Sequence, residues 1–183
     1  MINFDRRTDL CVFTASDLTA AINVVVPFCL PPTDGLSAMD AVVRQLSQML
    51  RAECACIYES NHRMSGAMTE LYRHRWRDWQ TDALSECLSG RPRSSMTQNC
   101  IRMLWRPPGK NAQALPHWNC IASCAPAGPN YFLTLSFARR VEPFSEREAI
   151  LFRCIHSSGI FSLITQFRVH AQRDSLSPKT RAG

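Results

Sequence analysis

The first clear pattern of hydrophobic and polar positions is a helical one that ends near residue 50. Its apolar residues recur at steps of three and four, which places them on one face of a helix that covers a core. Ser37 is a residue type that caps the start of a helix. The apolar run at residues 54–58 follows directly and predicts a buried strand. The apolar positions of the helix are Met39, Val42, Val43, Leu46, Met49 and Leu50.

The pattern is weaker on either side of these two elements. A shorter helix is predicted over residues 18–26, after Ser16 and Asp17, because Pro27 interrupts the apolar run. Residues 69–88 mix leucine, tyrosine and tryptophan at partly helical spacing, which leaves one or two helices or a mixed loop open. Residues 100–105 are short and apolar enough for a strand.

The second half of the chain becomes regular again at residue 118. The apolar runs 118–124 and 131–137 are separated by a segment rich in proline and glycine, which predicts a β-hairpin. Ser145 and Glu148 then have the spacing of a capping box, in which each side chain bonds the other residue's backbone amide. They begin an apolar helix that we expect to continue to about residue 167.

This order of elements predicts an α+β fold, in which helices flank an antiparallel sheet. One face of such a sheet is covered, and the other forms a cup. We expect residues 16–167 to form the domain, after an N-terminal extension over residues 1–15. A flexible basic tail is expected over residues 168–183.

Length and charge narrow the class of protein. The 183 residues have room for one domain, and the net charge of +6 is carried almost entirely by arginine. A basic surface suits anionic partners, and it is equally typical of an ordinary solvated surface. The nine cysteines are an odd number, and no secretory signal opens the chain, so a cytoplasmic location is expected. Residues 18–30 are too short an apolar segment to span a membrane, and no membrane partner is expected.

Motifs for catalysis are absent from the sequence. It contains no G-x-S-x-G nucleophile motif, no G-x-G-x-x-G loop and no Walker A loop. The neighbouring carboxylates Glu146 and Glu148 are explained by the helix start. We therefore expect neither an enzyme nor a cofactor.

Five cysteine and histidine residues leave an alternative open. Thiolate and imidazole are ligands of zinc and of iron–sulfur clusters. The spacing lacks a C-x2-C pair, however, and the cysteines lie in runs predicted as strands, where a reduced cysteine acts as a small apolar side chain. Core packing is the first interpretation, and a metal- or redox-responsive domain is the alternative. The residues are Cys54, Cys56, His117, Cys120 and Cys124.

Aromatic residues on the predicted strands are candidates for binding a small molecule. Tyrosine and tryptophan combine an apolar body with a polar tip, which suits the wall of a ligand cup, although core packing also explains them. The candidate ligand-binding residues are Tyr58, Trp105, Trp118, Tyr131 and Leu133.

Two further surfaces have candidate roles. Residues 73–77 interleave arginines with Trp76, which fits an anionic ligand or single-stranded nucleic acid, or else the exposed edge of a helix that Trp76 and Trp79 anchor. The last predicted helix is apolar on more than one face. Ile160, Leu163 and Phe167 are therefore candidates for dimerisation.

One family pattern fits the end of the chain. The letters RVEPFSERE at residues 140–148, the apolar helix after them, and LSPKTR at residues 176–181 resemble the end of the sensor half of LuxR-type transcriptional regulators. There a GAF-like or PAS-like domain is followed by a DNA-binding helix-turn-helix. The resemblance implies a GAF/PAS-like sensor domain that binds a small molecule or a partner subunit. Ser145 and Glu148 carry over as cap residues only.

The chain departs from this family at its end. Seven residues follow Leu176, whereas a DNA-reading helical module needs roughly 60 more. The resemblance therefore implies a sensor half without a complete DNA-binding module, and we expect no sequence-specific DNA binding. The expected partners are an unknown small molecule and either a second copy in a homodimer or a full-length regulator.

Overall fold

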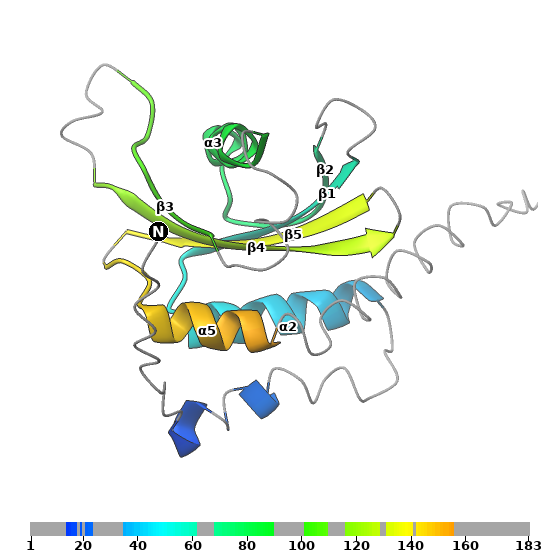
Figure 1. The fold of residues 1–183 in the computed structure, drawn as a ribbon, viewed down its shortest axis with the longest axis vertical. Coiled ribbons are helices and arrows are strands. Elements are labelled where there is room, and N and C mark those ends of the chain that lie inside the picture. The colour runs from blue at the N-terminus through cyan, green and yellow to red at the C-terminus, as the bar shows by residue number, and fades with distance from the viewer. Residues whose placement is uncertain are drawn as a thin grey trace, which may run out of the picture.

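Three helices and five strands follow one another along the described chain (Figure 1). A computed structural model describes residues 14–17, 19, 21–23, 35–61, 68–89, 101–109, 116–128, 131–140 and 142–155. The elements are α2 (Gly35–Met49), β1 (Cys54–Asn61), β2 (Met68–His74), α3 (Asp78–Ser89), β3 (Ile101–Trp105), β4 (Trp118–Gly128), β5 (Tyr131–Arg139) and α5 (Glu146–Ile155).

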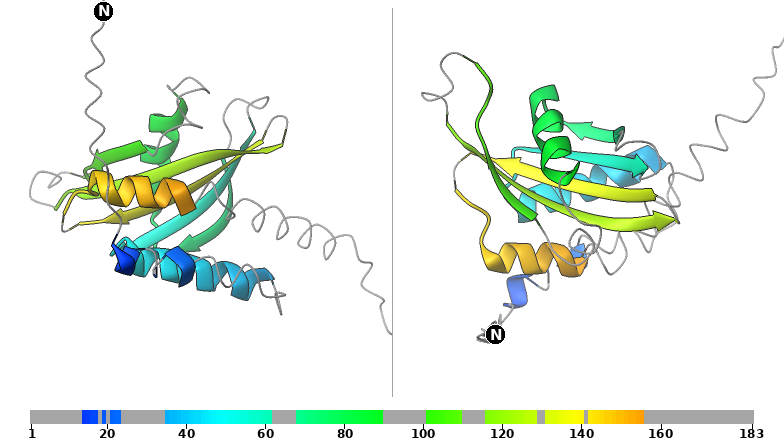
Figure 2. Two further views of the ribbon diagram at one scale, coloured as in Figure 1. Left: turned by 60° about the horizontal axis from the view of Figure 1, so that its bottom comes forward. Right: turned by 45° about the horizontal axis from the view of Figure 1, so that its top comes forward.

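The five strands form one antiparallel sheet in the order β2-β1-β5-β4-β3. Helices α2 and α5 lie against one face, and α3 lies over the other, as all the views agree (Figures 1 and 2). The α+β fold predicted from the sequence is therefore confirmed.

Strand β5 is the centre of the sheet and is buried on both faces. Leu133, Leu135 and Phe137 belong to the core beneath α2 and α5, where the Phe137 and Phe152 rings meet edge to face at 5.4 Å. Ala138 belongs to a second core under α3. Strand β5 thus separates two cores, and the sheet face that was expected to form a cup is itself covered, by α3.

Most predicted elements are found close to their predicted positions. The helix before residue 50, the strand at residues 54–58, the strand near residues 100–105 and the hairpin after residue 118 are all present. Residues 15–17, 19 and 21–23 are helical, in the region of the predicted first helix. Of the long last helix, the part up to Ile155 is described, and Ile160, Leu163 and Phe167 lie outside the described residues.

The sequence interpretation missed strand β2, since residues 69–88 were expected to form helices or a mixed loop. Residues 68–74 instead pair with β1 as an edge strand. Its residues are exposed or half-buried, so the apolar alternation that reveals a strand is missing there.

Two predicted helix starts were also wrong. Helix α2 begins at Gly35, two residues before Ser37. Residues 15–17, which were expected to precede the first helix, are themselves helical, and the Asp17 carboxylate accepts a hydrogen bond from the Thr14 amide at 2.6 Å, as in a helix cap.

Arg139, the last residue of β5, joins four parts of the chain. Its guanidinium binds both carboxylate oxygens of Glu148, at 2.7 and 3.0 Å. It also donates to the carbonyls of Leu50, Glu142 and Pro143, at 2.6 to 2.9 Å, and lies 4.1 Å from the centre of the Phe144 ring. The side chain is 3% exposed, and each of its donor nitrogens has a partner.

Glu148 is also the residue that caps α5. Its carboxylate accepts from the Ser145 amide at 2.7 Å, and the Glu148 amide donates to the Ser145 hydroxyl at 3.2 Å, which confirms the predicted capping box. Burial alone would raise the pKa of Glu148, but the hydrogen bonds from Arg139 and Ser145 outweigh it and lower the pKa. The carboxylate thus stays charged and holds the sheet and α5 together.

Arg51 follows α2 in a left-handed backbone conformation, with φ of 48°. The Ala52 amide bonds the Ser47 carbonyl at 2.8 Å, which is the hydrogen bond of a Schellman helix end. Glycine is the residue that suits this position, because a Cβ atom is strained there.

None of the helices in the described part of the chain is both long and apolar enough to cross a membrane.

Replacing Arg139 by leucine is expected to lower the free energy of unfolding by about 3–5 kcal/mol, because it leaves the Glu148 carboxylate without its partner. Arg140→Leu is the matched control. The pair of Arg140 with Glu53 is half-exposed, and losing it should cost less than about 1 kcal/mol. Urea unfolding followed by circular dichroism measures both, and equal losses would contradict the role given to Arg139.

Replacing Arg51 by glycine is expected to raise the free energy of unfolding by about 1 kcal/mol, because it removes the strained Cβ atom. Arg51→Ala keeps that atom and removes the guanidinium. Its stability should stay close to that of the original protein, since the Arg51–Glu142 pair is exposed. A glycine variant that melts no higher than the alanine variant would refute this account of residue 51.

Candidate functional site

The candidate site is the face of the sheet that α3 covers, called the α3 face from here on. Three rows of side chains cross β1, β5 and β4 there, side by side in register. All are buried, and all except Tyr58 are small. Because these side chains are small, the space between the sheet and α3 is left to side chains of α3 or to a ligand. The rows are Cys54, Ala138 and Cys120; Cys56, Ser136 and Ala122; and Tyr58, Thr134 and Cys124.

All four tryptophans of the chain gather at one end of the α3 face. Trp105 and Trp118 pair across β3 and β4, while Trp76 precedes α3 and Trp79 lies in its first turn. The rings meet edge to face, with centroids 5.8 Å apart for Trp76 and Trp105 and 6.3 Å apart for Trp79 and Trp118. The cluster anchors the start of α3 to the sheet.

Polar groups of α3 fix the helix over this face. The fully buried Gln80 accepts from the Arg77 amide at 2.9 Å and donates to the Cys54 sulfur at 3.5 Å. The Tyr58 hydroxyl lies 2.5 Å from Thr81 Oγ1. Burial raises the pKa of Tyr58 to about 12, so the phenol stays neutral.

Two buried polar atoms of the α3 face have no hydrogen-bond partner among the described residues. They are the indole nitrogen of Trp76 and the hydroxyl of Ser136, whose residues are 3% and 0% exposed. The Cys56 thiol lies beside Ser136 in the same row, and its sulfur is only a weak acceptor for the Ser136 hydroxyl, which can still gain a stronger hydrogen bond from a ligand oxygen. A buried group without a partner costs about 1–3 kcal/mol, so each is a place where a ligand gains by hydrogen bonding.

The four strand cysteines lie in two pairs, on β1 and β4, with β5 between them. Burial raises the pKa of Cys54 and Cys124 to about 11, and that of Cys56 and Cys120 still further. Metal binding and thiol chemistry need the thiolate, which burial opposes.

His117 lies apart from these thiols, where its Nε2 accepts from Arg106 at 2.6 Å. The residues that the structure describes contain no group of three or more His, Cys, Asp or Glu that could hold a metal ion. The alternative metal set is therefore not assembled there, and the cysteines serve as small apolar side chains of the floor.

The structure brings together three of the five predicted ligand-binding residues. Tyr58, Trp105 and Trp118 lie in the core under α3. Leu133 lies on the opposite face, in the core with α2 and α5, because β5 alternates between the two faces. Tyr131 is half-buried at the start of β5.

Sequence interpretation missed two residues that the geometry now makes central. Trp76 was expected either to stack in an anion or nucleic-acid site or to anchor an exposed helix edge, and its burial agrees with an anchoring role. Arg73, three residues before Trp76 in the same segment, is paired with Glu70 and Asp78, each at 2.6 Å. Ser136 could have been found from its position between apolar neighbours on a strand that is buried on both faces.

Comparison with known proteins bears on the fold. The chain shares its fold with JSC1_58120g3, a far-red absorbing protein with bound biliverdin, at 16% identity and a TM-score of 0.51 over 81% of this chain and 99% of the other. This likeness supports the GAF/PAS-like fold class.

Two other solved structures are similar at lower scores. The N-acylhomoserine-lactone-dependent LuxR-family factor CepR2 from Burkholderia cenocepacia is 12% identical, with a TM-score of 0.47 over 86% of this chain and 99% of the other. The VqsR LBD domain from Pseudomonas aeruginosa is 11% identical, with a TM-score of 0.45 over 85% and 94%. No family model and no curated protein matches the sequence.

Replacing Ser136 by alanine is expected to leave the free energy of unfolding unchanged or to raise it, because the buried hydroxyl bonds no nitrogen or oxygen of the described residues and has only the weak sulfur acceptor of Cys56 beside it. Thr134→Val is the matched control on the same strand and face. It removes a hydroxyl that lies 3.2 Å from the Cys124 sulfur, and it should cost about 1 kcal/mol. Thermal melts compare the two, and a larger loss for Ser136→Ala would show that this hydroxyl already has a structural partner.

Proposed function

We propose that this chain is a sensor domain that binds a small, uncharged organic molecule on its α3 face. The observation that carries the proposal is the pair of buried polar atoms, Trp76 Nε1 and Ser136 Oγ, above and within a floor of small side chains. A ligand that carries hydrogen-bond acceptors would satisfy both groups, and its flat or apolar part would pack against the tryptophan cluster.

The charges around the α3 face favour an uncharged ligand. The buried side chains of this core carry no ionised group, and the thiols and the Tyr58 phenol are held neutral. Glu70, whose carboxylate accepts a hydrogen bond from the Tyr58 hydroxyl at 3.3 Å, is already paired with Arg73 at 2.6 Å. A charged ligand would lose its hydration here without a free partner of opposite charge, which is costly.

The regulatory part of the proposal rests on the sequence. Residues 131–181 resemble the sensor half of LuxR-type transcriptional regulators, in which binding of a small molecule regulates transcription. The biliverdin-bound protein that shares the fold also binds a small organic molecule. In this proposal the domain binds without catalysing a reaction, acts in the cytoplasm and works with a second subunit.

A direct test is a thermal-shift screen of the whole chain with N-acylhomoserine lactones of graded length and with organic extracts of the cells that make the protein. A compound that raises Tm is then titrated by tryptophan fluorescence, since all four emitters lie at the site. Trp76→Phe keeps a ring and removes the N–H donor, and it should weaken binding roughly fivefold to tenfold.

Trp79→Phe is the control, because the same exchange is made in the same cluster without touching the unpartnered indole nitrogen. It should bind within about twofold of the original protein, because phenylalanine keeps an aromatic ring in the cluster and the Trp76 donor is unchanged. The proposal fails if no compound or extract raises Tm. It also fails if the two variants lose affinity equally, since the Trp76 donor would then have no part in recognition.

A further inference from the structure

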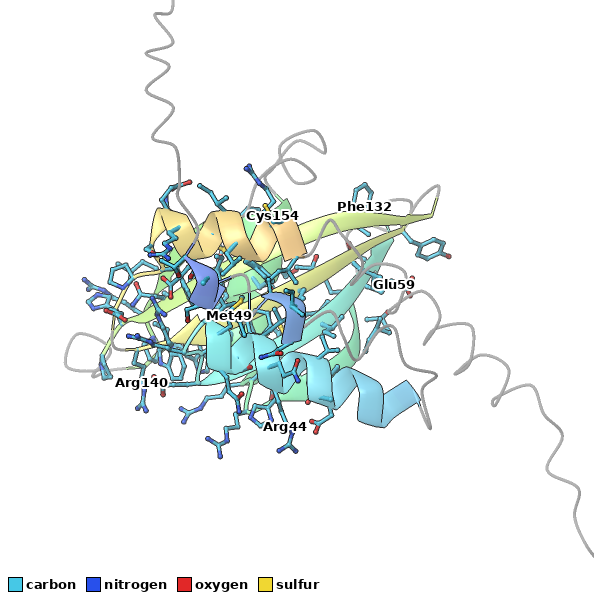
Figure 3. The ribbon with its side chains drawn as sticks, turned by 90° about the horizontal axis from the view of Figure 1, so that it is seen from below. Arg44, Met49, Glu59, Phe132, Arg140 and Cys154 are labelled. Carbon is cyan, nitrogen blue, oxygen red and sulfur yellow. The ribbon has the colours of Figure 1, made fainter. Side chains whose placement is uncertain are left out.

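A separate cavity of about 510 Å³ lies on the other side of the sheet from the α3 face. It forms where the end of α2, the end of β5 and the start of α5 meet the helical residues near position 16. Figure 3 shows this side of the molecule, with the short N-terminal helical pieces crossing between α2 and α5 and with Met49 beside them. None of its lining residues belongs to the core under α3.

Among the described residues, the lining carries three cations and three anions, and two of the three pairs are closed. Arg139 and Glu148 form the buried clamp between β5 and α5. Arg147 is bonded to Asp17, and hydrogen bonds from Thr14 and Arg147 hold the pKa of Asp17 at about 2. In both pairs the two opposite charges already bind each other, so neither pair offers an unpaired charge to a ligand.

The third pair, Arg51 and Glu142, is open. The nearest nitrogen and oxygen are 3.6 Å apart, and the side chains are 79% and 53% exposed. An exposed pair at this distance contributes little to stability, so a ligand can separate it at little cost. The left-handed backbone at Arg51 disfavours any side chain, and a binding role for the guanidinium accounts for an arginine at that position.

The remaining walls define the rest of the ligand. Met49, Pro143 and Leu151 are apolar, and Leu151 belongs to the buried core beneath them. The charges of the described lining residues sum to zero, and an anion alone would face Glu142, whereas a cation alone would face Arg51. A molecule with both charges and an apolar side group matches all three features.

We propose that this cavity binds a free α-amino acid with an apolar side chain. Arg51 holds the carboxylate in the two-pronged geometry that a guanidinium favours, and Glu142 holds the ammonium group. The side chain of the amino acid packs against Met49 and Leu151. Because the ligand contacts α2, α5 and the loop between β5 and α5, it stabilises the same junction as Arg139.

The test uses the whole chain and measures Tm with each of the protein amino acids in turn. L-leucine and other apolar amino acids are expected to raise Tm, and aspartate and lysine should do so much less. 4-methylpentanoate lacks the ammonium group of leucine, and 3-methylbutylamine lacks its carboxylate. Neither should raise Tm as leucine does.

Variants make the response specific to the site. Arg51→Gly is expected to melt higher than the original protein when free and to lose the leucine response, a combination that general destabilisation cannot produce. Glu142→Gln should also lose the response. Arg44→Gln, which removes an exposed arginine of α2 outside the cavity, should keep it.

Three results would overturn the proposal. They are no response to any amino acid, an equal response to 4-methylpentanoate, and a leucine response that survives in both Arg51→Gly and Glu142→Gln. Trp76→Phe should keep the leucine response, which separates this site from the one proposed on the α3 face.

Discussion

The bond between Arg139 and Glu148 is the contact on which the rest of the fold depends. One guanidinium at the end of the central strand holds the end of α2, the loop after β5 and the first turn of α5. Glu148 caps α5 through Ser145, and the same carboxylate binds Arg139 of β5. It therefore links the start of α5 directly to the sheet. Removing either partner of an ion pair with this little exposure strongly destabilises the folded protein. The same pair therefore fixes the positions of both α2 and α5 on the sheet.

This clamp determines what the two faces of the sheet are free to do. Under α2 and α5, large side chains such as Phe137 and Phe152 interdigitate and fill the core. The α3 face carries small side chains instead, and its cover is held by tryptophans at one end and by Gln80 and Thr81. The side that fixes the architecture is thus separate from the side that we propose binds the ligand. Strand β5 is shared by both, with Ser136 on one face and Phe137 on the other.

The sequence predicted those elements whose hydrophobic period matches their burial. The helix that contains Val42 and Leu46 was found because its buried face is continuous, and α5 because its capping box is local. Strand β2 was missed because an edge strand without a buried face has no alternation to detect. Within the site, Trp105 and Trp118 were predicted from their strands. Leu133 could be excluded from the α3 face only once the register of β5 in the sheet was known. The hydrogen bonding of the Trp76 indole and the Ser136 hydroxyl depends on the three-dimensional structure and cannot be predicted from residue spacing.

The central claim is that the buried Trp76 indole N–H donates a hydrogen bond to an acceptor atom of the bound ligand. Nitrogen-15 NMR of the four tryptophan indole groups tests it most directly, because each ring gives one signal and Trp76→Phe identifies the relevant one. Titration with a compound that raises Tm is expected to shift the Trp76 signal downfield and by more than the other three, as a new hydrogen bond forms at that nitrogen. A Trp76 signal that stays in place while binding saturates would contradict the account.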